Sequence, residues 1–186
     1  MRRVVLMVAL VLALPTLALA NSIIDYTNAG GTITASDSGL SLTSTIVAIH
    51  TVGGAVHGGD NLGTLTITAG AISGGSAAAG GTFGPGTLTI TDTGGAVLFS
   101  GTFTDAKWVK TDLTLGGMTQ YTLEITLNGG RGGSFQASFF STGDFTGHGN
   151  VAEGSTFVVV PEPGTMGLLG TGLVGIAGLV RRKLRV

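Results

Sequence analysis

Short runs of alternating apolar and polar residues dominate the middle of the chain. Threonine and β-branched residues fill these runs and glycine pairs separate them, which is typical of half-buried strands joined by tight turns. The runs cover residues 32–34, 40–50, 62–68, 87–91, 97–104, 108–115, 121–127, 134–140 and 156–160. The pattern predicts an all-β domain of eight or nine short strands, folded as a β-sandwich or, as the alternative, an open β-barrel.

One six-residue sequence occurs twice. Residues 63–68 read Gly-Thr-Leu-Thr-Ile-Thr, and residues 86–91 repeat it. On a strand, the leucines and isoleucines of both copies would face the core and the threonines would face outward. The outward residues, Thr64, Thr66, Thr68, Thr87, Thr89 and Thr91, are a candidate binding face for glycan or ice, although an ordinary strand with a polar outer face is the plainer interpretation. Between the copies, residues 69–86 are rich in glycine and alanine and predict a flexible loop.

The N-terminus has the three parts of a secretory signal. Arg2 and Arg3 precede an apolar run at residues 4–14, and Ala18-Leu19-Ala20 supplies a small-x-small cleavage site. The apolar run is short for a membrane span, which needs about 20 residues. We therefore expect residues 1–20 to be a signal peptide, with signal peptidase cleaving after Ala20 at the Ala18/Ala20 site.

The C-terminus combines a proline-rich triplet, an apolar stretch and a basic end. Pro161-Glu162-Pro163 comes first, and residues 164–180 carry no charge. As a helix these residues would reach about 26 Å, close to the thickness of a hydrocarbon core. The basic end consists of Arg181, Arg182, Lys183 and Arg185. The positive-inside rule places residues 181–186 in the cytoplasm, so a transmembrane helix at 164–180 would leave the domain at 21–160 outside it.

This tail, residues 161–186, resembles the PEP-CTERM sorting signal of Gram-negative bacteria. The resemblance is carried by the Pro161-Glu162-Pro163 triplet, the leucine-containing pairs of the apolar stretch and the terminal Arg-Arg-Lys. It implies recognition by exosortase, a membrane transpeptidase-like enzyme, with cleavage near the triplet and transfer to the cell surface or the exopolysaccharide matrix. It covers the tail alone and implies nothing about the central domain.

Composition excludes several classes of protein. Only 10% of residues are charged and there is no cysteine, which excludes a disulfide scaffold, a thiolate zinc site and a cysteine nucleophile. Between residues 21 and 160 there are three basic and nine acidic residues, a net charge of −6. A domain of this sign does not attract phosphate backbones, so no nucleic-acid partner is expected.

Candidate metal ligands are few and lack a motif. His50, His57 and His148 have no paired spacing, and no H-E-x-x-H sequence is present. The carboxylates of Asp60 and Asp144 lie near asparagines, but the order of a calcium-binding loop is missing. Solvated loop residues are the expected interpretation, and we predict no metal and no cofactor.

Aromatic residues are a further candidate for sugar binding. Trp108, Tyr26 and Tyr121 would suit stacking on a sugar, but with one tryptophan in the chain a core anchor is the better interpretation for Trp108. No nucleophile elbow, P-loop or zinc-protease motif occurs, so no catalytic residue is assigned.

Together these features predict an exported surface or exopolysaccharide-matrix protein that is structural or adhesive rather than enzymatic. Signal peptidase and exosortase are its expected processing partners, the inner membrane holds it before sorting, and exopolysaccharide is a candidate ligand. Two alternatives stay open. The first is a glycan- or ice-binding module that uses the threonine face, and the second is a hydrolase whose carboxylates come together only on folding.

Overall fold

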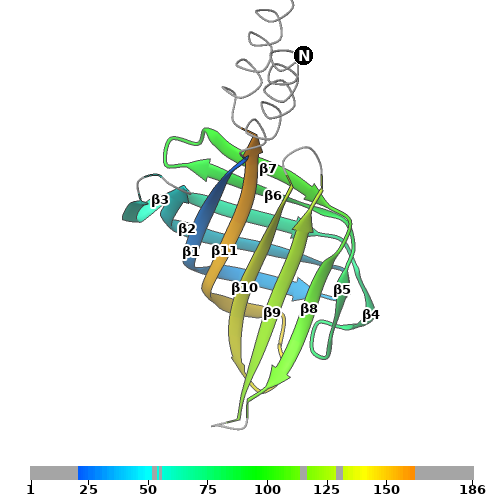
Figure 1. Cartoon of the computed structure of the whole chain (residues 1–186). Coiled ribbons are helices and arrows are strands. Elements are labelled where there is room, and N and C mark those ends of the chain that lie inside the picture. Colours follow the sequence, from blue (N-terminus) through cyan, green and yellow to red (C-terminus); the bar gives the residue numbers. More distant parts are fainter. Residues whose placement is uncertain (1–20, 52–53, 55, 114–116, 129–131, 162–186) are drawn as a thin grey trace, which may run out of the picture. The chain divides into compact units, whose positions relative to one another are not determined.

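The computed structural model describes residues 21–51, 54, 56–113, 117–128 and 132–161. These residues form eleven strands and no helix (Figure 1). The strands are β1 (Asn21–Ser36), β2 (Gly39–Thr51), β3 (Val56–Ala69), β4 (Ile72–Ser76), β5 (Gly80–Phe83), β6 (Gly86–Asp92), β7 (Val97–Phe103), β8 (Ala106–Asp112), β9 (Met118–Leu127), β10 (Gly133–Thr142) and β11 (His148–Pro161). Residues Ile23–Val159 make up one compact unit. The all-β prediction is confirmed.

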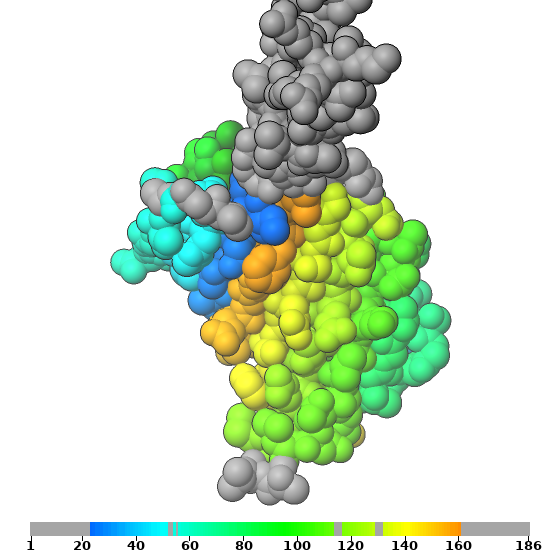
Figure 2. Space-filling view, in the orientation of Figure 1, coloured from blue at the N-terminus to red at the C-terminus, as the bar shows by residue number. Residues whose placement is uncertain are grey.

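The strands belong to a single sheet in the order β4-β5-β8-β9-β10-β11-β1-β2-β3-β6-β7. The sheet curls into a half-barrel, which corresponds to the open-barrel alternative rather than to two separate sheets. Figure 2 shows β1 and β11, the first and last strands, side by side in blue and orange. One hydrogen bond links the edge strand β7 to the other half of the curled sheet. The Asn128 amide after β9 donates it to the Thr102 carbonyl on β7 at 2.7 Å.

The β1–β11 boundary divides the sheet into two halves. We call β1, β2, β3, β6 and β7 the N-terminal half-sheet, and β4, β5 and β8 to β11 the C-terminal half-sheet. Alternate residues of both halves point inward, as the period of two requires. The largest fully buried side chains are Trp108, Tyr121, Phe83, Phe135, Phe139, Ile33, Leu42, Ile46, Leu65, Ile67, Leu88 and Ile90. The core is therefore the concave side of the curl.

Strand β1 is much longer than the expected run at residues 32–34. Two register shifts against β2 interrupt it, one between Thr27 and Asn28 and one between Ala29 and Thr32. The first shift adds a residue to β2, and the second adds one to β1. The second shift changes the buried positions of β1 from Tyr26 and Asn28 to Ile33 and Ala35, so the sequence shows no continuous pattern. At the second shift Gly31 has a φ of +94°, and a Cβ there would collide with the Thr43 carbonyl. This bulge brings Thr32 into register with Thr43.

The segment at residues 69–86 is not the flexible loop that its composition predicts. It contains β4 and β5, which pair with each other, and β5 also pairs with β8. Two hydrogen bonds to Asp37 hold this segment in place. The Ile72 amide donates to the Asp37 backbone carbonyl, and the Ala77 amide donates to the Asp37 carboxylate, both at 3.0 Å. The small side chains allow close packing, because a Cβ at Gly75 would collide with the Gly80 carbonyl.

Candidate functional site: a threonine array and an adjoining cleft

Hydroxyl side chains form three rows across the outer face of the N-terminal half-sheet. The two copies of the repeated sequence lie on β3 and β6, which pair directly so that Thr64, Thr66 and Thr68 oppose Thr91, Thr89 and Thr87. The same register continues onto β2, β1 and β7. The rows are Thr34, Ser41, Thr68, Thr87 and Thr102; Thr32, Thr43, Thr66, Thr89 and Ser100; and Thr45, Thr64 and Thr91. We call these thirteen residues the threonine array.

The array has a regular spacing because strands do. Neighbouring members of a row are separated by the distance between strands, about 4.8 Å, and successive rows by two residues, about 6.8 Å. A row that crosses five strands is therefore roughly 19 Å long. Within the array the Thr68 and Thr87 hydroxyls are 3.1 Å apart and share a hydrogen bond.

The inward residues explain why the threonines point out. Leu65, Ile67, Leu88 and Ile90 alternate with them and are fully buried. A shift of one residue would place these four apolar side chains in water, so the burial fixes the face. The six threonines predicted from the sequence thus lie together on one face, and their use in binding stays a prediction.

A cleft of about 540 Å³ adjoins the array where β1, β10 and β11 meet. Thr32 and Thr34 belong both to its lining and to the array. From the other side, Phe140 contributes a ring that is 46% exposed, and Asn150 and His148 contribute polar groups. The Thr34 hydroxyl is 3.3 Å from Nδ1 of His148, so the two sides of the cleft are joined by a polar contact. Sequence reasoning missed this cleft because residues 32–34 are far in the chain from residues 140–150.

The aromatic residues proposed for sugar stacking are core residues instead. Trp108 is 1% exposed, Tyr121 is fully buried and Tyr26 is 5% exposed, which confirms the core interpretation of Trp108. Trp108 and Tyr121 stack at 5.1 Å between ring centroids, and Phe145 meets both edge-on.

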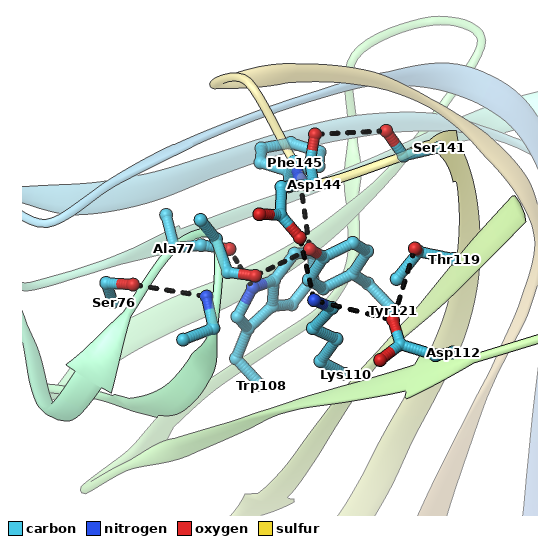
Figure 3. Close-up of polar contacts among 12 residues, drawn as sticks. Ser76, Ala77, Trp108, Lys110, Asp112, Thr119, Tyr121, Ser141, Asp144 and Phe145 are labelled. Atoms are coloured by element: carbon cyan, nitrogen blue, oxygen red, sulfur yellow. Dashed lines mark hydrogen bonds and ion pairs between the residues drawn. The ribbon is translucent and has the colours of Figure 1, made fainter. Parts of the chain in front are cut away.

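Their polar atoms hold two connecting segments against the sheet (Figure 3). Nε1 of Trp108 donates to the Ala77 carbonyl at 2.9 Å, and the Tyr121 hydroxyl donates to the Ala78 carbonyl at 2.6 Å. The same hydroxyl accepts from the Phe145 amide at 3.0 Å. The aromatic cluster is therefore the anchor of the β4–β5 connection and of the segment between β10 and β11.

Two carboxylates converge on one lysine near this cluster. Nζ of Lys110 is 2.7 Å from Asp144 and 3.4 Å from Asp112 (Figure 3). The hydrogen bond that Lys110 donates to the Asp144 carboxylate is the main cause that raises the pKa of Lys110 above its ordinary value. Both acids are largely exposed, so this is a surface ion pair that stabilises little.

The other candidate ligands have turn or surface roles. Asn61, next to Asp60, accepts from the Gly63 amide at 3.1 Å, and His148 contacts Thr34 rather than Asp144. His57 is exposed. Within the described part of the chain, no three His, Cys, Asp or Glu residues come close enough to hold a metal ion.

The terminal predictions fall outside the described residues, apart from Pro161 at the end of β11. This applies to Ala18 and Ala20, to Glu162 and Pro163, to the apolar stretch 164–180 and to Arg181, Arg182, Lys183 and Arg185. In the part that is described, there is no helix of the length and apolar character needed to span a membrane.

Comparison with known proteins concerns the tail. Residues 159–183 match the family model described as the PEP-CTERM protein-sorting motif. The tail carries a PEP-CTERM sorting motif. The match begins within β11, which ends at Pro161, so the motif overlaps the end of the last strand. The motif indicates an exported protein that is processed by exosortase and carries a membrane-anchored sorting signal. No curated protein and no solved structure matches the chain.

Proposed function

We propose that this protein is a structural or adhesive component of the bacterial cell surface or of the exopolysaccharide matrix, delivered there by exosortase. The observation that carries the proposal is the PEP-CTERM motif at residues 159–183, which overlaps the end of the last strand. In this arrangement the signal peptide at residues 1–20 starts export, and the tail holds the chain in the inner membrane until exosortase acts near Pro161.

The described domain favours adhesion over catalysis. It offers a broad array of hydroxyls with an adjoining cleft, and the described lining of that cleft contains no carboxylate. The acids that do come together, Asp112 and Asp144, are engaged by Lys110. A glycoside hydrolase typically needs a pair of carboxylates placed in a cleft, where one could act as a general acid.

A binding module for glycan or ice is the second candidate, and one specific observation favours it. Thr66 lies directly opposite Thr43 on one side and Thr89 on the other, and this register extends over five strands. A regular hydroxyl lattice of this kind suits a ligand that is itself regular. The second candidate is compatible with the first, because an adhesive matrix protein needs a surface that binds.

The sorting proposal is tested by intact mass and cell fractionation, with and without the host's exosortase. We expect the protein from the wild-type host to lack the residues after the Pro161–Pro163 region and to leave the inner membrane. In the exosortase mutant it should keep its tail and stay in the membrane. A tail that is intact in both strains would show a permanent anchor and overturn the proposal.

A matched pair of variants separates the motif from the domain. Glu162→Ala removes the charge of the triplet, whereas Glu153→Ala removes an exposed charge on β11 outside the matched residues. We expect the first variant to retain its tail and the second to be processed normally. Equal processing of both variants would show that exosortase does not recognise the Glu162 side chain.

A further inference from the structure

We propose that the cleft and the threonine array together bind a linear, neutral polysaccharide, with one sugar ring stacked on Phe140 and the chain continuing along the hydroxyl rows. This deepens the proposed function, on which it rests, by naming the ligand of the domain. It assigns a role to the cleft, which the sequence did not reveal.

The cleft has the chemistry of a sugar subsite. A pyranose ring presents a face of C–H groups and an edge of hydroxyls. The half-exposed ring of Phe140 offers an apolar platform for that face. Around it, Asn150, His148 and the hydroxyls of Thr32 and Thr34 supply hydrogen-bond donors and acceptors. A concave site with one aromatic surface and a few convergent polar groups is the usual form of a small-ligand site.

The array extends this subsite into a track. Thr32 and Thr34 begin the two long rows, which continue through β2, β3, β6 and β7 for roughly 19 Å. Each exposed hydroxyl exchanges a hydrogen bond with water for one with a ligand, so each contributes little alone. A polymer that touches many of them from one anchored end gains from effective concentration. A single sugar in the cleft would lack this gain.

Charge selects a neutral chain. The array consists of threonine and serine alone, and the region 21–160 has a net charge of −6. An acidic polysaccharide would be repelled by this field. A free lysine could offset this repulsion by attracting an acidic chain, but Lys110 is already paired with Asp144 and Asp112.

The decisive variants use two phenylalanines of nearly equal exposure. Phe140 is 46% exposed and lines the cleft, whereas Phe157 on β11 is 47% exposed and lies outside its lining. The probe is the neutral fraction of the host's extracellular polysaccharide, the part that an anion exchanger does not retain. Binding to the full chain in detergent is measured by affinity electrophoresis. We expect Phe140→Ala to weaken binding at least tenfold, Phe157→Ala to change it less than twofold, and Phe140→Trp to preserve it.

A second pair tests the array. Thr66 is central in the array, and Thr126 is an exposed, outward threonine on β9 of the C-terminal half-sheet. Lysine fits either exposed position, but at Thr66 it would obstruct a chain lying along the rows. We expect Thr66→Lys to weaken binding about tenfold and Thr126→Lys to leave it unchanged. Unfolding by urea, followed by far-UV circular dichroism, checks that all five variants are folded.

Three outcomes overturn the inference. These are no binding of the neutral fraction by the wild-type chain, an equal loss in the two phenylalanine variants, and partition of the protein into growing ice without retention by the polysaccharide. The last would assign the array to ordered water. Failure of the proposed function would be seen in a different experiment. A chain that binds polysaccharide but keeps its tail in the host with exosortase would contradict the sorting proposal and leave the binding proposal standing.

Discussion

The two half-sheets use the same alternation for different outer faces. Inside, the N-terminal half is mostly aliphatic, with Leu65, Ile67 and Leu88, whereas the C-terminal half holds the large rings of Trp108 and Tyr121. Outside, the N-terminal half carries the threonine array, and the C-terminal half carries a mixture. That mixture includes Lys107, Val109, Glu124, Phe140, Glu153 and Phe157, all exposed.

The mixed face shows what the fold requires of an outward position. Charged, aliphatic and aromatic side chains are all accepted there, because an exposed position contributes little to packing. The fold therefore does not demand threonine on the other half. Either the strand-forming preference of threonine or a ligand must account for the uniform array. The predictions below separate these explanations and test the division between the halves.

The largest effect is expected from the anchor of the C-terminal half. Trp108→Ala removes a buried indole from a cluster of rings and leaves the Ala77 carbonyl without its donor. We expect the free energy of unfolding to fall by about 3–5 kcal/mol, as measured by urea denaturation. Hydrogen exchange should accelerate most at the backbone amides of β4 and β5, because the indole holds their connection.

The neighbouring Val109 is the control for this variant. It points outward from the same strand and is 42% exposed, so Val109→Ala should change stability by no more than about 0.5 kcal/mol. If exchange under Trp108→Ala rose equally in β2 and β3, the two halves would be one cooperative unit and the division drawn above would fail.

A smaller loss is expected from a single hydroxyl. Tyr121→Phe keeps the stacked ring but removes the donor to the Ala78 carbonyl and the acceptor of the Phe145 amide. Buried groups left without partners cost about 1–3 kcal/mol. Urea denaturation measures the loss, and Thr126→Val, outward on the same strand, should be near neutral. A Tyr121→Phe variant as stable as the wild type would mean that water replaces the hydroxyl.

The contrast between the halves also explains what the sequence predicts well. The alternation in residues 63–68 and 86–91 fixes which side chains face inward, because the period of a strand is two and burial penalises a slip. It does not fix which strands are neighbours. β3 pairs with β6 because β4 and β5 pass to the other edge of the sheet, and the sequence marks residues 69–86 only by small side chains.

Contacts made by the backbone and by distant segments escape sequence reasoning. Residues 69–86 are ordered through the Asp37 carbonyl, the Trp108 indole and the Tyr121 hydroxyl, none of which a local pattern reveals. The cleft likewise forms only because the topology places Thr34 on β1 beside the consecutive strands β10 and β11, which carry Phe140 and His148. The sorting motif of the tail differs from these contacts, because it is a contiguous stretch of sequence and can be recognised without the fold.

The smallest effect on stability is expected from the array itself, and it decides between strand preference and binding. Thr66 and Thr89 face each other across β3 and β6. The double variant Thr66→Val and Thr89→Val keeps the β-branched shape of both side chains and replaces each hydroxyl by a methyl group. If the array exists for a ligand, urea denaturation should show a change within about 0.5 kcal/mol for the double variant, while retention by the neutral polysaccharide falls. The same change at Thr122 on β9 should affect neither. A cross-strand threonine pair stabilises a sheet by about 0.2–1 kcal/mol, so a loss at the top of that range with unchanged binding would assign the threonines to the sheet alone.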